Sequence, residues 1–203
     1  MSEVACVIFD LGRTLIPFNL ESLEARLEAP GAKMAAQRLF RQFETGWLRA
    51  EEFEAAICVL TRLRRAEFAP WWNSIFERRW LIPEPWVRAL LARFRCGLLS
   101  NTNVLHFEFL AAEQPLLREF AFRVLSHEVG AVKPEARIYE AAEAAAGCAP
   151  EAILYFDDVP GFVAAARARG WQAHTFTGAG ALTDHLSSYG LQLNGGRRPR
   201  ARS

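Results

Sequence analysis

The sequence predicts an α/β protein built on a doubly wound parallel sheet, and three observations carry that prediction. Short apolar runs alternate with segments of helical pattern along most of the 203 residues. The first run, Val4–Phe9, is apolar on both faces, as a strand is when helices cover both sides of a parallel sheet. Polar residues follow several runs directly, at the edge where open α/β sheets bind their ligands.

Four strands are expected from the apolar runs, and helices are expected between them. The strands are Val4–Phe9, Cys96–Leu99, Ile153–Phe156 and Trp171–Thr177. The last run alternates more than the others, which is typical of a strand nearer the edge of a sheet. Pro134 and Pro160 each begin a helix, because proline suits the first helical turn, and Gly147 and Gly170 mark the two ends.

Residues 17–85 interrupt this alternation with long helical stretches and no clear strand. We therefore divide the chain into an α/β core of residues 1–16 and 86–193, a helical domain of residues 17–85 and a basic tail of residues 194–203. The tail holds four arginines and no acidic residue. Without interleaved aromatic residues it predicts a flexible, solvated end rather than a nucleic-acid site.

Composition excludes several classes of protein. The formal net charge of +1 provides no overall basic field for nucleic acid. The four cysteines form no C-x-x-C pair, which argues against zinc-ribbon and thioredoxin-like sites, and free thiols suit a reducing compartment. The N-terminus does not resemble a signal peptide, and no stretch approaches the ~18 apolar residues of a membrane span. We expect a cytoplasmic protein without membrane or nucleic-acid partners.

Asp10, Ser100 and the pair Asp157-Asp158 follow three of the expected strands. A single aspartate after a strand is ordinarily a turn or cap residue, but three strand ends of one sheet are less easily accidental. Carboxylates gathered there would repel one another unless a cation lay between them. Oxygen ligands of this kind suit Mg²⁺, which takes one or two carboxylates together with phosphate oxygens and water.

Four segments, in this order, resemble the motifs of the haloacid dehalogenase (HAD) superfamily. They are Asp10-Leu11-Gly12-Arg13-Thr14, Ser100-Asn101-Thr102-Asn103, Lys133-Pro134 and Phe156-Asp157-Asp158. The resemblance covers roughly residues 4 to 177, and around the last three motifs it is especially similar to bacterial α-D-glucose-1-phosphate phosphatases and their relatives. It implies a HAD-like Rossmannoid core, with residues 17–85 as a cap that covers the site and selects the substrate.

The resemblance also implies a phosphatase, that is, a phosphoric monoester hydrolase. Asp10 would be the nucleophile and form an aspartyl-phosphate that water then hydrolyses. Mg²⁺ would be held by the Asp10 carboxylate, the Gly12 carbonyl and Asp158, with Asp157 supporting the metal site from beside it.

The substrate implied by the resemblance is a small phosphorylated metabolite, with a sugar phosphate as the specific expectation. Ser100 and the Asn101 backbone N–H would hydrogen-bond the phosphoryl oxygens. Lys133 would bring a compact positive charge to the same oxygens. Only two of the 24 basic residues are lysines, and one of them falls at this position.

Two positions depart from the family pattern. Gly12 stands where HAD phosphatases usually carry an aspartate that acts as general acid and base, so it favours a phosphate with a good leaving group, such as an anomeric sugar oxygen. Phe162 stands where relatives often have an amide or carboxylate, which removes support around the metal site. A catalytically degenerate HAD-like binding protein therefore stays open. A 2-haloacid dehalogenase is also open, although Asp157-Asp158 would repel its carboxylate substrate.

Four further residues each have two interpretations. Arg13 is either a cation that faces the substrate or a solvated loop charge. His106 is either a late general base or, as we favour, a histidine on a helix surface. Trp71 and Trp72 of the helical domain either belong to the core of that domain, as we favour, or include one residue that lines a sugar-binding surface.

Overall fold

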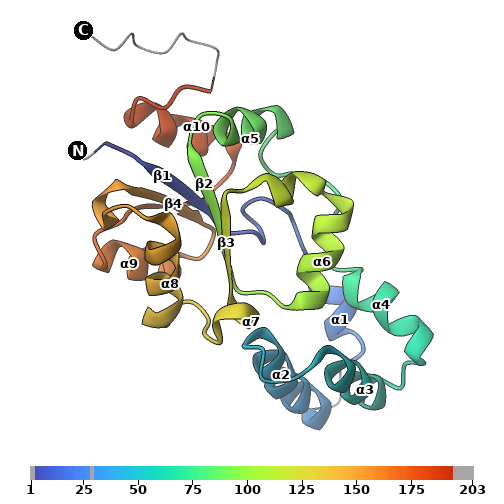
Figure 1. The fold of residues 1–203 in the computed structure, drawn as a ribbon. Coiled ribbons are helices and arrows are strands. Elements are labelled where there is room, and N and C mark those ends of the chain that lie inside the picture. The colour runs from blue at the N-terminus through green and yellow to red at the C-terminus, as the bar shows by residue number, and fades with distance from the viewer. Residues whose placement is uncertain (1–2, 28–29, 194–203) are drawn as a thin grey trace, which may run out of the picture.

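Five parallel strands form the centre of the computed structural model, which describes residues 3–27 and 30–193 (Figure 1). The strands are β1 Cys6–Phe9, β2 Arg95–Ser100, β3 Phe122–Leu125, β4 Ile153–Asp157 and β5 Gln172–Thr175. Their order in the sheet is β3-β2-β1-β4-β5, and every neighbouring pair is parallel. This arrangement confirms the predicted α/β fold class.

Strand β3 is an edge strand that the sequence does not predict. It is four residues long, and its first two residues, Phe122 and Arg123, are not fully buried. Its pairing depends on the neighbouring strand, because a Cβ on Gly97 of β2 would lie 2.2 Å from the Phe122 ring. Tertiary contact of this kind decides strand formation in short segments with a weak local pattern.

Helices cover both faces of the sheet (Figure 1). One face packs on α8 (Ala136–Ala146) and α9 (Pro160–Ala168), and the other on α5 (Glu84–Leu91), α6 (Val104–Glu113) and α10 (Ala179–Ser188). Three short elements complete the core: the 3₁₀ helices Pro115–Glu119 and Pro150–Ala152, and α7 (Ser126–Val129). Cys6 and Ile8 belong to one core cluster, whereas Val7 and Phe9 belong to the other. Alternate residues of β1 thus face opposite layers, which explains why the whole run is apolar.

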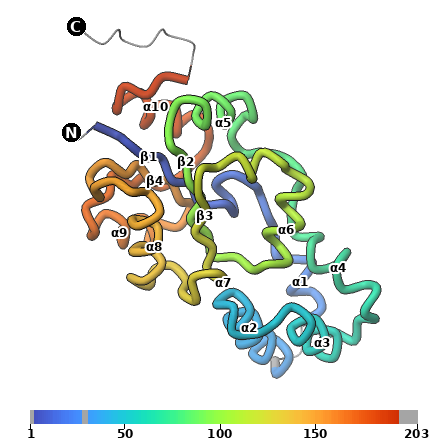
Figure 2. Tube along the Cα trace, viewed as in Figure 1, coloured from blue at the N-terminus to red at the C-terminus, as the bar shows by residue number. Residues whose placement is uncertain are grey.

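The remaining helices gather at one end of the molecule (Figure 2). These cap helices are α1 Glu21–Glu24, α2 Pro30–Glu44, α3 Ala50–Thr61 and α4 Arg65–Asn73. They share a hydrophobic cluster of their own, in which the Phe53 ring contacts Phe43 and Trp72, with centroid distances of 4.1 and 4.9 Å. Ile82, by contrast, belongs to a cluster of the sheet, and Pro83 precedes α5. The boundaries of the two domains remain a proposal that this packing supports.

Two chain segments connect the cap helices to the sheet, and they pair with each other. Phe18 and Phe76 form an antiparallel bridge. The Asn19 N–H donates to the Ile75 carbonyl at 2.9 Å, and the Glu77 N–H donates to the Pro17 carbonyl at 3.1 Å. These two bonds hold the entering and leaving segments side by side where no strand was expected.

The cap helices touch the core at a second place, beyond α2. Gly46 has a φ of +70°, and a Cβ there would lie 2.3 Å from the carbonyl oxygen of His127 in α7. Nearby, the Arg41 guanidinium of α2 pairs with the Glu135 carboxylate. Glycine is therefore required at residue 46 both for its backbone angle and for this close approach.

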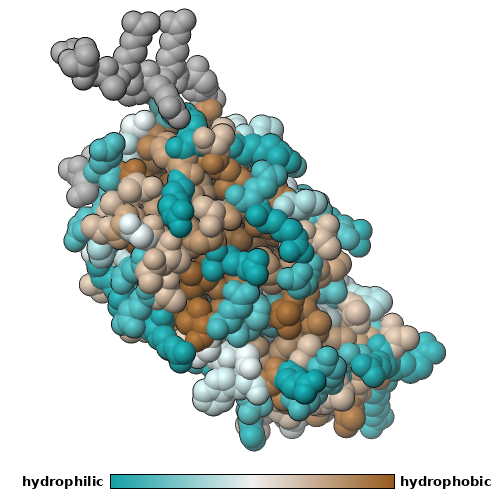
Figure 3. Space-filling view, in the orientation of Figure 1, coloured by the Kyte–Doolittle hydropathy of each residue, from teal (hydrophilic) through white to brown (hydrophobic). Residues whose placement is uncertain are grey.

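The surface is mixed in character. On the face shown in Figure 3, hydrophobic residues interrupt the hydrophilic surface near the boundary between the cap helices and the core. Within residues 3–27 and 30–193, no helix has both the length and the apolar character needed to cross a bilayer. The predicted basic tail lies outside the described residues.

We expect Gly46→Ala to lower the free energy of unfolding by more than Gly147→Ala does. Both glycines have a positive φ, of 70° and 66°, but only residue 46 has backbone in the way of a Cβ. Alanine in this backbone region costs about 1–2 kcal/mol by itself. Urea denaturation of both variants checks the difference, and equal losses would show that the contact with His127 is dispensable.

Candidate active site at the carboxyl ends of the strands

The register of the sheet brings Asp10 and Asp157 to the same level. Phe9, the last residue of β1, lies between Leu98 of β2 and Phe156 of β4. The next residue along β1 is Asp10, whose N–H donates to the Phe156 carbonyl at 2.9 Å, and the next along β4 is Asp157. Both side chains are almost fully buried, with residue exposures of 6% and 0%. The sheet thus places two carboxylates at neighbouring strand ends, as the sequence predicts.

Lys133 lies between these two carboxylates. Its Nζ donates to Asp10 Oδ1 at 2.7 Å, to Asp157 Oδ2 at 2.5 Å and to the Leu99 carbonyl at 3.1 Å. The side chain is 1% exposed. Burial alone would lower the pKa of Lys133, but the two carboxylates outweigh that effect and hold the pKa above its ordinary value. The ammonium is therefore charged and lies between the two carboxylates.

The loop after β2 is held by its own polar groups. The Asn101 side chain accepts from the Lys133 N–H at 2.7 Å and donates to the Lys133 carbonyl at 3.1 Å. The Thr102 N–H donates to the Ser126 hydroxyl, and the Asn103 side chain accepts from the His106 N–H at the start of α6. The Ser100 hydroxyl, by contrast, has no hydrogen-bond partner in the described part of the chain, which leaves it available to a ligand.

Three carboxylates could hold a divalent cation here. Oxygen atoms of Asp10, Asp157 and Asp158 lie within 4.8 Å of one another. Burial raises the pKa of Asp10 to about 7, because Lys133 offsets the lost hydration only in part and Asp157 raises the pKa further. Burial, followed by repulsion from Asp157, also raises the pKa of the half-buried Asp158. A hard cation would relieve this excess of negative charge.

Phe18 fills the space beside Gly12. A Cβ on Gly12 would lie 2.6 Å from Cε1 of the Phe18 ring. Phe76 packs edge-on against that ring, with 6.2 Å between centroids, and the Arg13 guanidinium lies over it at 4.6 Å. The exposed Arg13 therefore contacts an aromatic ring. The space beside the glycine at residue 12 is thus filled by an aromatic side chain.

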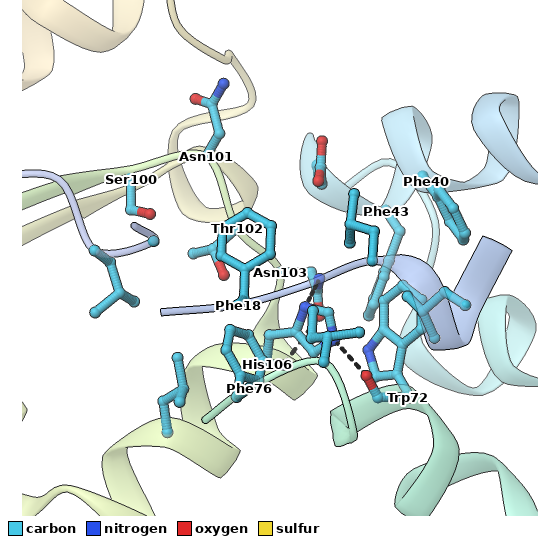
Figure 4. A pocket seen from close by; sticks show the side chains of 17 residues that line it. Phe18, Phe40, Phe43, Trp72, Phe76, Ser100, Asn101, Thr102, Asn103 and His106 are labelled. Carbon is cyan, nitrogen blue, oxygen red and sulfur yellow. Dashed lines mark hydrogen bonds between the residues drawn. The ribbon is translucent and has the colours of Figure 1, made fainter. Parts of the chain in front are cut away.

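A cavity of about 200 Å³ opens next to these residues, between the core and the cap helices (Figure 4). Ser100 and Asn101 lie on one side of it. Five aromatic side chains line the rest: Phe18, Phe40, Phe43, Trp72 and Phe76. Glu44 is the one acidic residue among the lining residues. Sequence reasoning missed Phe18 and Glu44, because neither lies in a motif.

His106 is neither a general base nor a surface residue. It is 8% exposed, and its ring stacks on Trp72 with 4.3 Å between centroids. Nε2 lies 3.0 Å from the Trp72 carbonyl oxygen and Nδ1 lies 3.1 Å from Asn103 Nδ2 (Figure 4). Burial lowers the pKa of His106 to about 4, so the ring is neutral, with Nε2–H as donor and Nδ1 as acceptor. His106 therefore joins α6 to the cap helices.

Comparison with known proteins identifies the family. Residues 4–170 match the haloacid dehalogenase-like hydrolases. The chain belongs to this family. Phosphatase MT3486 of Mycobacterium tuberculosis is 32% identical over 106 residues, which are 50% of this chain and 49% of that protein. The chain thus matches about half the length of that relative.

Solved structures confirm the fold of this HAD-like hydrolase. The HAD family enzyme bt-2542 of Bacteroides thetaiotaomicron has a TM-score of 0.77 at 23% identity, covering 92% of this chain and 99% of that chain. The same enzyme has been solved in complex with magnesium and inorganic phosphate. A HAD-like family hydrolase of Porphyromonas gingivalis has a TM-score of 0.76 at 25% identity, covering 91% of this chain and 98% of that chain.

Tyr155 supports the ion pairs of the HAD-like hydrolase, and sequence reasoning missed it. Its hydroxyl donates to Asp157 Oδ2 and lies 3.2 Å from Lys133 Nζ. Tyr155 lies two positions before Asp157 along β4, so both side chains lie on the same face of the sheet. Phe162, where relatives often have a polar residue, presents its ring 5.1 Å from the Lys133 ammonium. The contacts around the lysine thus combine a hydroxyl with an aromatic face.

We expect Tyr155→Phe to lower the free energy of unfolding by about 1.5–3 kcal/mol, because the lost hydrogen bond has a carboxylate as its acceptor. Tyr139→Phe is the matched control. That buried hydroxyl donates to the neutral Phe162 carbonyl at 3.0 Å, and its loss should cost only about 0.5–1.5 kcal/mol. Urea denaturation measures both. A smaller loss for Tyr155→Phe than for the control would contradict this role.

Proposed function

We propose that the chain is a Mg²⁺-dependent phosphatase that hydrolyses a small phosphorylated metabolite through an aspartyl-phosphate on Asp10. The observation that carries the proposal is the buried ammonium of Lys133, held at 2.7 Å from Asp10 and 2.5 Å from Asp157. An aspartate kept next to a fixed positive charge can be ionised and approach a phosphate dianion.

Asp10 is proposed as the nucleophile. Its Oδ1 accepts from Lys133, whereas Oδ2 has no hydrogen-bond partner among the described residues and is free to attack. In the first step, a carboxylate oxygen bonds to phosphorus as the ester P–O bond breaks, and the electron pair leaves with the ester oxygen. In the second step, water attacks phosphorus, the Asp10 carboxylate is released and inorganic phosphate departs.

Three groups are proposed to bind the phosphoryl oxygens. They are the free Ser100 hydroxyl, the Asn101 backbone N–H and the Lys133 ammonium. The Asn101 side chain ties the two loops together through the Lys133 backbone, so these donors keep a constant spacing. Such preorganised donors stabilise charge that develops in the transition state.

Mg²⁺ is proposed to bind the Asp10 and Asp158 carboxylates and the Gly12 carbonyl, with Asp157 beside them. The carboxylate cluster fits this role, because oxygen atoms of its three members lie within 4.8 Å of one another, and Asp10 and Asp157 are both held by the Lys133 ammonium. When bound, the ion would offset repulsion between the nucleophile and the phosphate. The magnesium and phosphate found together in bt-2542 support the same proposal.

The leaving group must depart without a proton from residue 12. Gly12 has no side chain, and general acid catalysis typically contributes about 10²–10⁴-fold in rate. Phosphates with a weakly basic leaving oxygen need this help least. A sugar 1-phosphate is one such substrate. It is also the specific substrate that the sequence resemblance suggests.

A HAD-like protein that binds a ligand without turning it over is the second candidate. The observation in its favour is the Phe18 ring beside Gly12, which fills the space where a side chain of residue 12 would begin. A 2-haloacid dehalogenase is less favoured, because Asp157 and Asp158 would repel a carboxylate substrate.

We expect Asp10→Asn to abolish phosphate release, with a loss of about 10³-fold or more, because the amide cannot form the covalent intermediate. Asp184→Asn, on the exposed side of α10, is the control and should retain full activity. The measurement is phosphate release from a metabolite panel with Mg²⁺. Activity that survives Asp10→Asn would refute the mechanism. Failure of every substrate, together with no thermal shift by beryllofluoride and Mg²⁺, would favour the second candidate.

We expect the affinity for Mg²⁺ to fall as the pH drops below about 7. A proton competes with the metal for Asp10, whose pKa burial raises to about 7. The protonated carboxyl is the weaker ligand, so the apparent Kd should increase by up to about tenfold for each pH unit below the pKa. Calorimetric titration from pH 8 to pH 5.5 measures this dependence. Asp10→Asn should bind weakly with much less dependence on pH, and a constant wild-type affinity would contradict the assignment.

A further inference from the structure

The cavity next to Asp10 has polar groups at one end and aromatic groups at the other. Ser100, Asn101, Thr102 and Asn103 all come from the loop after β2. The side chains of Asn101 and Asn103 are already hydrogen-bonded to other parts of the chain. At the end formed by the cap helices, the polar side-chain groups are the Glu44 carboxylate and the Nε1–H of Trp72, which has no partner among the described residues. They are too few for the several hydroxyls of a sugar, and each unpaired hydroxyl would cost about 1–3 kcal/mol.

Two titratable side chains of the lining, His106 and Glu44, are the candidates to replace the missing acid at residue 12. Both ring nitrogens of His106 are occupied by Trp72 and Asn103. Glu44 is the last residue of α2, and burial raises the pKa of its carboxyl although Arg41 of the same helix lowers it in part, so the Glu44→Gln variant described below tests whether this carboxyl serves the leaving group. Neither Gly12 nor His106 offers a proton, which favours a leaving oxygen that departs as an anion.

The size of the cavity suits a single aromatic ring. Its volume is about 200 Å³, whereas an apolar protein cavity of roughly 150 Å³ accepts benzene. Phe18 and Phe40 are only partly buried and line this space. Aromatic rings pack favourably against such neighbours through edge-to-face and offset contacts.

We infer that the substrate of this site is an aryl phosphate, a phosphate monoester whose leaving group is an apolar aromatic ring with a phenolic oxygen. This inference rests on the proposed phosphatase function and names its substrate class. Attack by Asp10 breaks the bond between phosphorus and the phenolic oxygen, and the electron pair leaves as a phenolate. A phenol ionises near pH 10, as tyrosine does, so the phenolate departs without protonation and takes its proton from water afterwards.

Four substrates separate the two parts of the inference. Phenyl phosphate is aromatic with a weakly basic leaving oxygen, and benzyl phosphate is aromatic with a strongly basic one. Glucose 1-phosphate and glucose 6-phosphate repeat this contrast between a weakly and a strongly basic leaving oxygen, with a polar sugar in place of the aromatic ring. With Mg²⁺ present, we expect phenyl phosphate to exceed each of the others in kcat/KM by about 10²-fold. Relative to phenyl phosphate, benzyl phosphate should have a lower kcat, whereas glucose 1-phosphate should have a higher KM.

Binding supplies a readout that does not require turnover. Phenylphosphonate, measured by calorimetry with Mg²⁺, should bind at least about tenfold more tightly than inorganic phosphate, which corresponds to about 1.4 kcal/mol. Phe40→Ala should remove most of this difference. Leu39→Ala is the matched control, because it is half-buried on the same helix but does not line the cavity. Glu44→Gln should leave the preference among the four phosphates unchanged.

The outcomes distinguish this inference from the proposed function. Comparable hydrolysis of all four phosphates, or a preference for glucose 1-phosphate, would retain the phosphatase and overturn the aryl assignment. Loss of the preference in Glu44→Gln would also overturn it, since Glu44 would then act on the leaving group. Tight binding of phenylphosphonate without hydrolysis of any ester would refute the phosphatase but support the ligand class. Binding of phenylphosphonate no tighter than phosphate would refute the ligand class.

Discussion

The ammonium of Lys133, buried between Asp10 and Asp157, is the interaction on which the rest of the site depends. Removing a charge from water costs several kcal/mol, and the attraction to two carboxylates repays that cost only if every donor and acceptor is well placed. The carboxyl ends of β1 and β4 supply the carboxylates at one level. The Asn101 side chain holds the backbone of Lys133 from both sides. The polar loops are thus arranged around one charged group.

The same constraint explains the residues around the lysine that are not charged. Asp157 accepts from Lys133, from the Tyr155 hydroxyl and from the Val159 N–H, which satisfies a carboxylate that is fully buried. Phe162 removes a hydrogen-bonding side chain from this shell but offers its ring to the ammonium. A site that had lost its function would have no need to keep such a costly buried charge, because apolar replacement of a buried ion pair is often neutral or stabilising.

Sequence reasoning succeeds where the pattern is local and fails where the partner is distant. The fold class follows from apolar runs such as β1, and the convergence of Asp10 with Asp157 follows from their positions just after or at strand ends. Strand β3 is not recognisable, because it depends on the space above Gly97. The burial of His106 depends equally on Trp72, which lies 34 residues away in the chain. Such contacts exist only once the cap helices have packed on the core.

The contact between Gly12 and Phe18 is also one that exists only in the folded chain, and it changes how the missing acid is understood. From the sequence, a glycine at residue 12 is a simple loss. In the structure, the space that a side chain would need is taken by a ring held against Phe76 and Arg13. That ring comes from the segment that leads to the cap helices and also lines their cavity. The same packing of Phe18 therefore accounts for the absence of an acid at residue 12 and for part of the apolar lining. A leaving group that suits this site must depart without a proton and must also fit an apolar cavity.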